Sequence, residues 1–307
     1  MRPSTATLRP ALLGASLVLL VAQHAAAGAG PGPGAASHWR FDETKGTVAH
    51  DSAGPFNGTI LGAPSFVRGV AGNAIKMSRA SNDRITVGTV YSGSTAFSVS
   101  LWVKIAPGAP GDNYPVSNHY AGIVNGWIFF TGTSGGCYGD PNSPSLYTAD
   151  NCGGEVTAPV NVNDGGWHHL VATYTPGGTK SIYVDGGVAD ATAFANPINV
   201  NGGAQFLIGG VVVSGSPTAA FDGWIDDLQV YTRPLGCAEV QYLYAHPGEE
   251  VPVLSDLNGD GAVDAMDLAI LLGAWGPCGA GPCSTDLDCS GSVDAADLAI
   301  LLGAWTG

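Results

Sequence analysis

Short segments in which apolar and polar residues alternate run from His38 to Tyr244, as half-buried antiparallel strands do. Gly, Asn, Pro and Asp separate them at a spacing of roughly ten residues. The segments are HWRFDE (38–43), NAIKMS (73–78), RITVG (84–88), FSVSLWVKI (97–105), GWIFFTGT (126–133), WHHLVATYTP (167–176), KSIYVDG (180–186), FLIGGV (206–211) and FDGWIDDLQVYTRP (221–234). The pattern predicts a mainly β fold, an antiparallel two-sheet jelly-roll sandwich, and roughly 200 residues suffice for one sizeable core.

Helical patterns appear only near the end of the chain. CAEVQYLY (237–244) predicts one short helix, and DLAILLGAW occurs twice, at 267–275 and 297–305. The apolar positions of the first copy fall at i, i+3, i+4 and i+7 and form one stripe: Leu268, Leu271, Leu272 and Trp275. A helix this short is marginal alone. We therefore expect each copy to pack against its twin.

A matching acidic run of twelve residues precedes each copy. Oxygen donors fall at positions 1, 3, 5, 9 and 12, a glycine (Gly261 or Gly291) stands at position 6, and position 7 offers a carbonyl. The first run supplies Asp256, Asn258, Asp260, Ala262, Asp264 and Asp267; the second supplies Asp286, Asp288, Ser290, Ser292, Asp294 and Asp297. This is the spacing of a calcium-binding EF-hand loop, and it predicts two calcium ions as cofactors.

The charge distribution supports a cation in this region. The formal net charge is −14, no Lys or Arg follows Arg233, and eight aspartates lie between residues 256 and 297. Uncompensated carboxylates would repel one another unless the segment is disordered or binds a cation. The acidic surface also argues against nucleic acid and anionic membranes as partners.

Export is predicted from the first residues. A basic start, the apolar run ALLGASLVLLVA (11–22) and AAA (25–27) are typical of a signal peptide over 1–27, followed by a Gly/Pro leader over 28–37. No other long apolar run occurs, so we expect a secreted or cell-surface protein without a membrane span after cleavage. Of the six cysteines, Cys137 and Cys152 are expected to pair, and the pairing of Cys237, Cys278, Cys283 and Cys289 stays open.

The two loops, with Asp rather than Glu at position 12 and no entering helix, make residues 254–307 resemble a dockerin type I module. Residues 246–253 are then a linker. The resemblance implies calcium binding and docking to a cohesin-like scaffold or a cell-surface protein. Positions 10 and 11, which contribute to partner choice in that family, are apolar here: Ala265–Met266 and Ala295–Ala296. A calcium-stapled structural terminus, or a sorting tag for another secreted partner, is the alternative.

Four stretches make residues 38–245 resemble the LamG-like, concanavalin A-like jelly-roll family: HWRFDETKGTVAHDSAGPFNGTI, FSVSLWVKI, WHHLVATYTPGGTKSIYVDG and FDGWIDDLQVYTRPLGCAEVQYLY. The resemblance implies a module that binds carbohydrate or protein, often with a structural calcium. Asp42, Asp51, Asp226 and Asp227 are candidate ligands for that ion. They could instead cap turns or pair with Arg40, Arg84 or Arg233.

The catalytic residues of a hydrolase are not evident. Glycosidases of this fold need two facing carboxylates, and the chain has only five glutamates, none in the Glu-x-Asp-x-x-Glu pattern of laminarinase-like enzymes. We therefore predict a non-catalytic protein that recognises a polysaccharide or glycoprotein, with a glycoside hydrolase carrying a dockerin as the alternative. Loop aromatics are the candidate sugar contacts: Tyr114, Tyr120, Tyr138 and Tyr147.

Overall fold

The computed structural model describes residues 34–91, 95–109, 112–120, 126–132, 142–148, 155–193, 198, 204–279 and 283–307. The predicted signal peptide, most of the leader, the Cys137–Cys152 pair and Tyr138 lie outside this description. Within it, no helix has both the length and the apolar character needed to cross a membrane.

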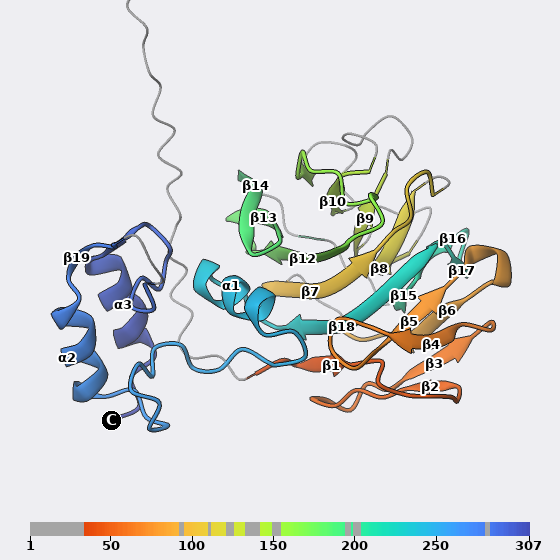
Figure 1. The fold of residues 1–307 in the computed structure, drawn as a ribbon. Helices are drawn as coiled ribbons and strands as arrows, with labels where there is room; N and C mark the ends of the chain where they lie inside the picture. The colour runs from red at the N-terminus through yellow and green to blue at the C-terminus, as the bar shows by residue number, and fades with distance from the viewer. Residues whose placement is uncertain are drawn as a thin grey trace, which may run out of the picture.

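The first sheet of the jelly roll has eight antiparallel strands in the order β14-β13-β12-β7-β18-β5-β4, with β1 beside β18 (Figure 1). Its strands are β1 (Ser37–Trp39), β4 (Ser65–Arg68), β5 (Asn73–Met77), β7 (Phe97–Lys104), β12 (Trp167–Tyr174), β13 (Thr179–Val184), β14 (Gly187–Ala193) and β18 (Gly223–Tyr231). A hairpin joins β13 to β14. Asp185 and Gly186 both have positive φ there, as a tight two-residue turn requires.

The second sheet also has eight strands, in the order β11-β10-β9-β8-β15-β6-β3-β2. Its strands are β2 (Val48–Ala49), β3 (Gly58–Leu61), β6 (Arg84–Gly88), β8 (Asn113–His119), β9 (Gly126–Thr131), β10 (Pro144–Tyr147), β11 (Val156–Thr157) and β15 (Gln205–Ile208). A separate hairpin pairs β16 (Gly210–Val213) with β17 (Ser216–Ala219), and a 3₁₀ turn, η1 (Arg79–Ser81), precedes β6. The predicted antiparallel sandwich is confirmed.

The main core fills the space between the two sheets. Trp39, Phe129 and Phe206 are fully buried there, and Trp39 stacks on Phe206 with ring centroids 5.5 Å apart. The expected half-burial of the strands is wrong for several of them. All six residues of β9 are buried, as are the six central residues of β7, because other segments cover parts of the outer faces of both sheets.

Helix α1 (Cys237–Ala245) covers part of the outer face of the first sheet. Its Glu239 accepts a hydrogen bond from the Gly236 N–H and pairs with Arg233, which fixes the first turn. Val240 and Leu243 are buried against Tyr231 and other residues of the sheet. The helix predicted over 237–244 is therefore present, and it explains why the residues of the sheet face beneath it are buried.

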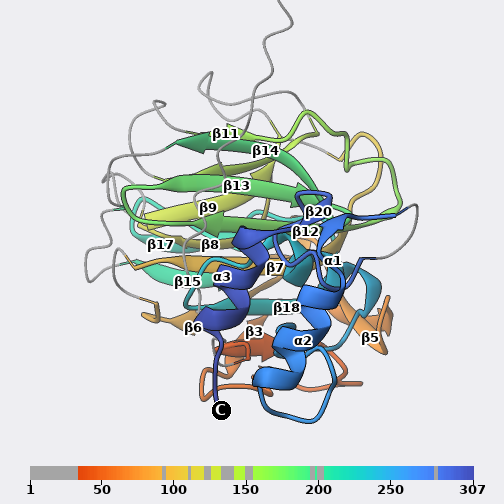
Figure 2. The ribbon, with the colours of Figure 1, turned by 90° about the vertical axis from the view of Figure 1, so that its left-hand side faces the viewer.

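The tail module, residues 254–307, contains α2 (Ala265–Gly273) and α3 (Ala295–Gly303), and it lies beside α1 in both ribbon views (Figures 1 and 2). Each loop pairs with the segment that follows the helix of the other unit. In the second acidic loop (loop 2, 286–297), β20 (Ser292–Val293) pairs with β19 (Gly276–Pro277). In the first acidic loop (loop 1, 256–267), Val263 exchanges hydrogen bonds with Thr306. The duplication thus builds two mutually supporting units.

The segment predicted as a linker, 246–253, lies against the jelly roll. The Gly248 N–H donates to Asp227, the Gly248 carbonyl accepts from Arg40, and Val251 is buried in the cluster beneath α1. A disulfide joins Cys237, the first residue of α1, to Cys289 in loop 2. The tail module is therefore attached to the jelly roll by contacts and by a covalent bond as well as by the chain.

Candidate functional site: the paired acidic loops

Loop 1 is organised by its first aspartate. The Asp256 carboxylate accepts hydrogen bonds from the N–H groups of Gly259, Asp260 and Gly261. Gly261, at position 6, has φ of 94°, a left-handed conformation that favours glycine. The chain thereby bends around one carboxylate, and the side chains at positions 3 and 5 face the same space.

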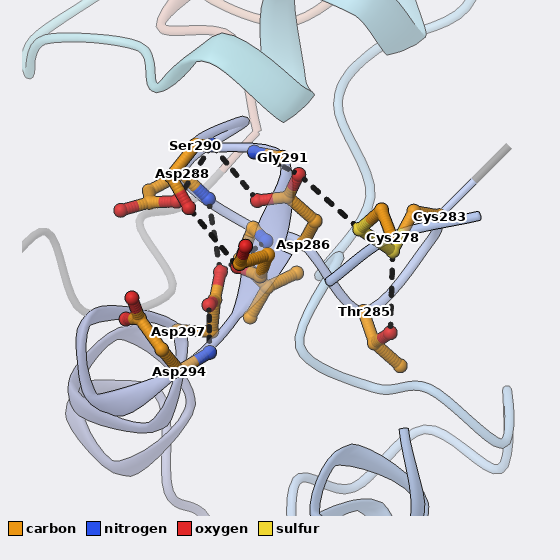
Figure 3. The surroundings of a disulfide bond; sticks show 11 residues. Cys278, Cys283, Thr285, Asp286, Asp288, Ser290, Gly291, Asp294 and Asp297 are labelled. Carbon is orange, nitrogen blue, oxygen red and sulfur yellow. Dashed lines mark hydrogen bonds between the residues drawn. A yellow bond between two sulfur atoms is a disulfide. The ribbon is translucent and has the colours of Figure 1, made fainter. Parts of the chain in front are cut away.

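Loop 2 repeats this arrangement and brings three carboxylates together (Figure 3). Ser290 and Gly291 donate backbone N–H groups to Asp286. Ligating oxygens of Asp286, Asp288 and Asp297 all lie within 4.8 Å of one another. Sequence positions 1, 3 and 12 of the loop therefore meet at one point.

Position 12 closes each loop on its own helix. Asp297 Oδ1 accepts from the N–H groups of Leu287 and Asp288, and Oδ2 accepts from the Asp294 N–H. Asp267 makes the equivalent contacts in loop 1. Both carboxylates are buried. The shorter aspartate thus ties the start of the loop to the first turn of the helix.

The charges of loop 2 are unbalanced within the protein. Burial raises the pKa of Asp286, and Asp288 and Asp297 raise it further, although backbone N–H donors act in the opposite direction. An all-oxygen donor set of this kind fits a hard divalent cation such as calcium, which takes six to eight oxygens and neutralises the repulsion. The residues present therefore fit the predicted ion.

Helix starts are fixed at position 9 of each loop. Asp264 accepts from the Met266 N–H at the start of α2, and Asp294 accepts from the Ala296 N–H at the start of α3. Both are N-cap residues of a capping box. Each of these aspartates therefore serves as a helix cap in addition to its predicted place among the calcium ligands.

The apolar stripe of each helix is only partly buried. Leu271 and Leu301 are fully buried with Val263 and Val293 in the small core of the tail module. Leu272 and Trp275, predicted to face the twin helix, are instead about half exposed. We use the term docking face for six exposed apolar side chains, which are between 37% and 62% exposed: Met266, Ile270, Leu272, Trp275, Leu302 and Trp305.

The jelly-roll aspartates serve local structure. Asp51 accepts from Ser37 and from backbone N–H groups of His38, Gly54 and Phe56. Burial raises its pKa, but these hydrogen bonds outweigh burial and leave it lowered. Asp42 accepts from the Asn73 N–H. Both contacts match the turn-capping alternative for these residues.

Asp226 and Asp227 lie at a bulge where the register between β18 and β7 shifts. Asp226 accepts from the Val70 and Ala71 N–H groups, but burial raises its pKa to about 7. Asp227 accepts from His38 and the Gly248 N–H, and these bonds outweigh burial and lower its pKa.

Within the described part of the chain, none of these four aspartates joins a group of three ligating side chains within 4.8 Å of one another. A jelly-roll calcium stays a prediction, and it has no assembled site here.

Three of the four tyrosines predicted as sugar contacts, Tyr114, Tyr120 and Tyr147, lie on the outer side of the second sheet. Tyr114 packs on Phe130 with centroids 5.9 Å apart, and its hydroxyl donates to Asp112. Tyr147 contacts His119 edge-on. Tyr120 lies near Gly215 at the tip of the β16–β17 hairpin. These residues share one side of the fold, and their role as sugar contacts stays a prediction.

Sequence reasoning could not assign the two disulfides of the tail. Cys278 pairs with Cys283 beside Asp286, and Cys289 pairs with Cys237 (Figure 3 shows the first). One signal was present. Cys289 stands at position 4 of loop 2, between the predicted ligand positions 3 and 5 rather than at one of them.

Two families match the chain. The concanavalin A-like lectin/glucanases superfamily matches residues 79–241, and the dockerin type I domain matches residues 254–303. Dockerin type I domains bind calcium and dock onto cohesins, and they are typical of extracellular or cell-surface proteins. A search of curated proteins returned no match.

Solved structures share the jelly roll. Domain 4 of AbnA, a GH43 extracellular arabinanase from Geobacillus stearothermophilus, in complex with arabinotriose, is 21% identical with a TM-score of 0.52, and the match covers 68% of this chain and 98% of that one. The binding domain of Paraclostridial Mosquitocidal Protein 1 is 14% identical with a TM-score of 0.51, covering 69% and 52%.

A botulinum neurotoxin type C structure, whose title concerns cell entry through two ganglioside molecules, is 11% identical with a TM-score of 0.51, covering 69% and 51%. The chain thus spans about half the length of the toxin chains it matches. At these identities the likeness shows the fold alone. With its sandwich and its family match over more than half its length, the chain belongs to the concanavalin A-like lectin/glucanase superfamily and carries a C-terminal dockerin type I domain.

Proposed function

We propose that this protein is a secreted, non-catalytic recognition protein whose tail module attaches it to a cohesin-like partner. The observation that carries the proposal is the docking face. Met266, Ile270, Leu272 and Leu302 stay exposed on two helices whose N-termini are fixed by the acidic loops, and Trp275 and Trp305 stay exposed just after the helices end. A merely structural staple would bury its apolar stripes, whereas exposed apolar patches mark interaction surfaces.

Calcium is the cofactor of this proposal. Bound in the loops, it supplies positive charge that offsets the clustered carboxylates. In loop 2, Asp286, Asp288 and Asp297 would hold it, with Ser290, Ser292 and Asp294 contributing at their loop positions. The chain's own contribution is the backbone: the N–H groups that orient each carboxylate also fix the start of each helix. Ion binding and the docking face are therefore coupled.

A carbohydrate ligand for the jelly roll is supported by what related structures hold. The arabinanase domain was solved with arabinotriose, and the neurotoxin structure concerns gangliosides. These ligands belong to those proteins, and they make a polysaccharide or glycoprotein the reasonable class to test here.

The positions of the glutamates support a non-catalytic role. Glu239 pairs with Arg233, Glu249 accepts from Tyr242, and Glu250 accepts from the Ala35 N–H. Glu43 accepts from the His50 N–H. Four of the five glutamates are thus engaged in structural contacts, which leaves Glu155 as the remaining glutamate that could serve in an acid–base pair.

The docking proposal is tested by titrating the full chain with a purified type I cohesin module in excess calcium. Binding should disappear with a chelator and should weaken at least about tenfold in Leu272→Glu, because the change places a charge in the interface. Val253→Glu, at an exposed apolar residue outside the docking face, is the matched control. Equal binding by both variants would contradict the assignment of the docking face.

The recognition proposal is tested by incubating the protein with arabinan and with ganglioside-containing vesicles. Retention without release of reducing ends is the expected outcome. Release of reducing ends that is abolished in Glu155→Gln would instead establish the hydrolase alternative.

A further inference from the structure

One row of side chains crosses the first sheet at right angles to its strands. Lys76 on β5 is paired with Trp224 on β18, Trp224 is paired with Lys104 on β7, and Lys104 is paired with Trp167 on β12. Directly paired residues of antiparallel strands share a face. We call these four residues the Lys–Trp row.

The row faces away from the core. The neighbours Ile75, Val103 and Ile225, each one position along a strand, are fully buried between the sheets. Because successive side chains of a strand point to opposite faces, the row lies on the outer face. Lys76 is exposed, and the other three residues are half-buried. Helix α1 covers the same face further along β7 and β12, where Tyr244 stacks on Trp102 and His169, so it leaves the row open.

The two lysines have aromatic partners and no acidic ones. Lys76 Nζ lies 5.0 Å and Lys104 Nζ 5.5 Å from the centroid of the Trp224 ring. No carboxylate lies within ion-pairing distance of either ammonium group in the described part of the chain. Asp226, on the same face, is buried and accepts from the backbone of Val70 and Ala71 instead. Cation–π contact orders the ammonium groups and leaves their charge uncompensated.

This charge is unusual for the protein. The net charge is −14 and the whole chain has eleven Lys and Arg residues. Several of these are engaged elsewhere: Arg79 pairs with Asp222, Arg233 pairs with Glu239, and Lys180 is fully buried. Two unpaired cations that flank an indole are therefore a local positive site on an acidic molecule, and such a site selects an anion.

We propose that the Lys–Trp row binds an anionic polysaccharide, with uronate or sulfate groups placed at the lysines and sugar rings against the indoles. Neighbouring strands are about 4.8 Å apart, so the indoles, two strands apart, lie about 10 Å apart on a nearly straight line. An extended glycan laid across the strands meets a ring surface, a cation and a second ring surface in turn. The proposal names a ligand class and a site for the jelly roll, and it rests on the carbohydrate part of the proposed function.

The row lies apart from the two faces already described. The docking face belongs to the tail module, and the candidate tyrosines Tyr114, Tyr120 and Tyr147 lie on the outer side of the second sheet. A glycan on the row would therefore leave both of them free.

The test measures binding of the full chain to three probes at low ionic strength by calorimetry: polygalacturonate, dextran sulfate and neutral arabinan. The variant is Lys76→Gln/Lys104→Gln. Lys45→Gln/Arg68→Gln, which removes two exposed positive charges elsewhere, is the matched control. Trp224→Ala and Trp224→Phe examine the ring, and thermal unfolding checks that each variant is folded.

We expect at least one anionic probe to bind, with the uronate and sulfate arms identifying which anion is preferred. The paired lysine change should weaken that binding about tenfold, the control pair should change it less than about twofold, and added salt should weaken it for the wild type. Trp224→Ala should weaken binding, and Trp224→Phe should retain most of it.

Two results would overturn the proposal in distinguishable ways. If the wild type binds a probe with the same affinity as the lysine variant, the row is not the site, and recognition elsewhere on the jelly roll stands. If a folded wild type binds none of the three probes, both the row and the carbohydrate part of the proposed function fail.

Discussion

In the jelly roll, two eight-stranded sheets enclose large side chains such as Trp39, Phe129 and Phe206, whereas in the tail module the buried apolar residues are a few leucines, valines and an alanine. The tail has eight aspartates and no basic residue, and two disulfides end in it. The jelly roll is large enough to bury a sizeable apolar core, whereas a unit of some 50 residues needs additional constraints. The comparison indicates that bound ions and disulfide bonds stabilise the tail module, whose apolar core is small.

The largest expected effect that would break this comparison is calcium removal. Two sites, each saturated a hundredfold above its dissociation constant, stabilise the tail by about 5 kcal/mol in total. Chelation should therefore abolish hydrogen-exchange protection in peptides from 284–307 and leave peptides from β7 protected. If chelation reduced the hydrogen-exchange protection of both regions equally, or of neither, the proposed difference between the tail module and the jelly roll would be contradicted.

The second effect concerns covalent attachment. Cys237 and Cys289 are 52 residues apart, so their disulfide restricts a long loop of the unfolded chain and contributes about 4 kcal/mol on the chain-entropy account. Cys237→Ser/Cys289→Ser should lower the midpoint of denaturant unfolding of the tail accordingly. Cys278→Ser/Cys283→Ser, which opens a loop with a separation of five, is the control and should cost about 2 kcal/mol.

A third effect should appear only in the jelly roll. Burial lowers the pKa of His169 to about 4 from 6.5, and the tail contains no histidine. As the pH falls from about 6.5 towards 4, His169 becomes protonated in the unfolded chain but stays neutral in the folded protein. The free energy of unfolding therefore falls across that window by up to about 3 kcal/mol. His169→Gln should remove this part of the pH dependence in denaturant titrations. His50→Gln, at an exposed histidine, should leave it unchanged.

The smallest effect separates the two sides of α3. Leu302 is about half exposed, so Leu302→Ala should change the stability of the tail by no more than about 0.5 kcal/mol. Its neighbour Leu301 is fully buried, and Leu301→Ala should cost about 2 to 5 kcal/mol. Thermal unfolding of the calcium-loaded protein measures both. A large loss in Leu302→Ala would mean that the docking face is part of the core.

Much of the fold could be predicted because local pattern and tertiary environment agree. The strand predicted over 84–88 is β6 with the same limits, and the helix predicted over 237–244 is α1 with one residue added. The paired loops were also evident, because ligand spacing within twelve residues is a local property.

Strand β8 could not be predicted in the same way. NYPVSNH has one proline and several polar residues, yet it is almost fully buried at the centre of the second sheet. Asn113 accepts from Arg79 and from the Asp222 N–H, and Ser117 donates to the Gly210 carbonyl. Such partners are distant in sequence, so no periodicity along the chain indicates them. The Lys–Trp row escaped prediction for the same reason, since only strand register aligns its members.

The bond between Cys237 and Cys289 also affects how a docked molecule would be presented. A module joined by a flexible linker adopts many orientations. When the jelly roll and the tail module both bind their partners, this freedom is restricted at an entropic cost. Here α1 is at once the lid of the sandwich and the anchor of loop 2. The tail module is thereby held to the jelly roll at a second point besides the chain, so a partner bound to the tail would leave the jelly roll less freedom of orientation than a single flexible linker allows.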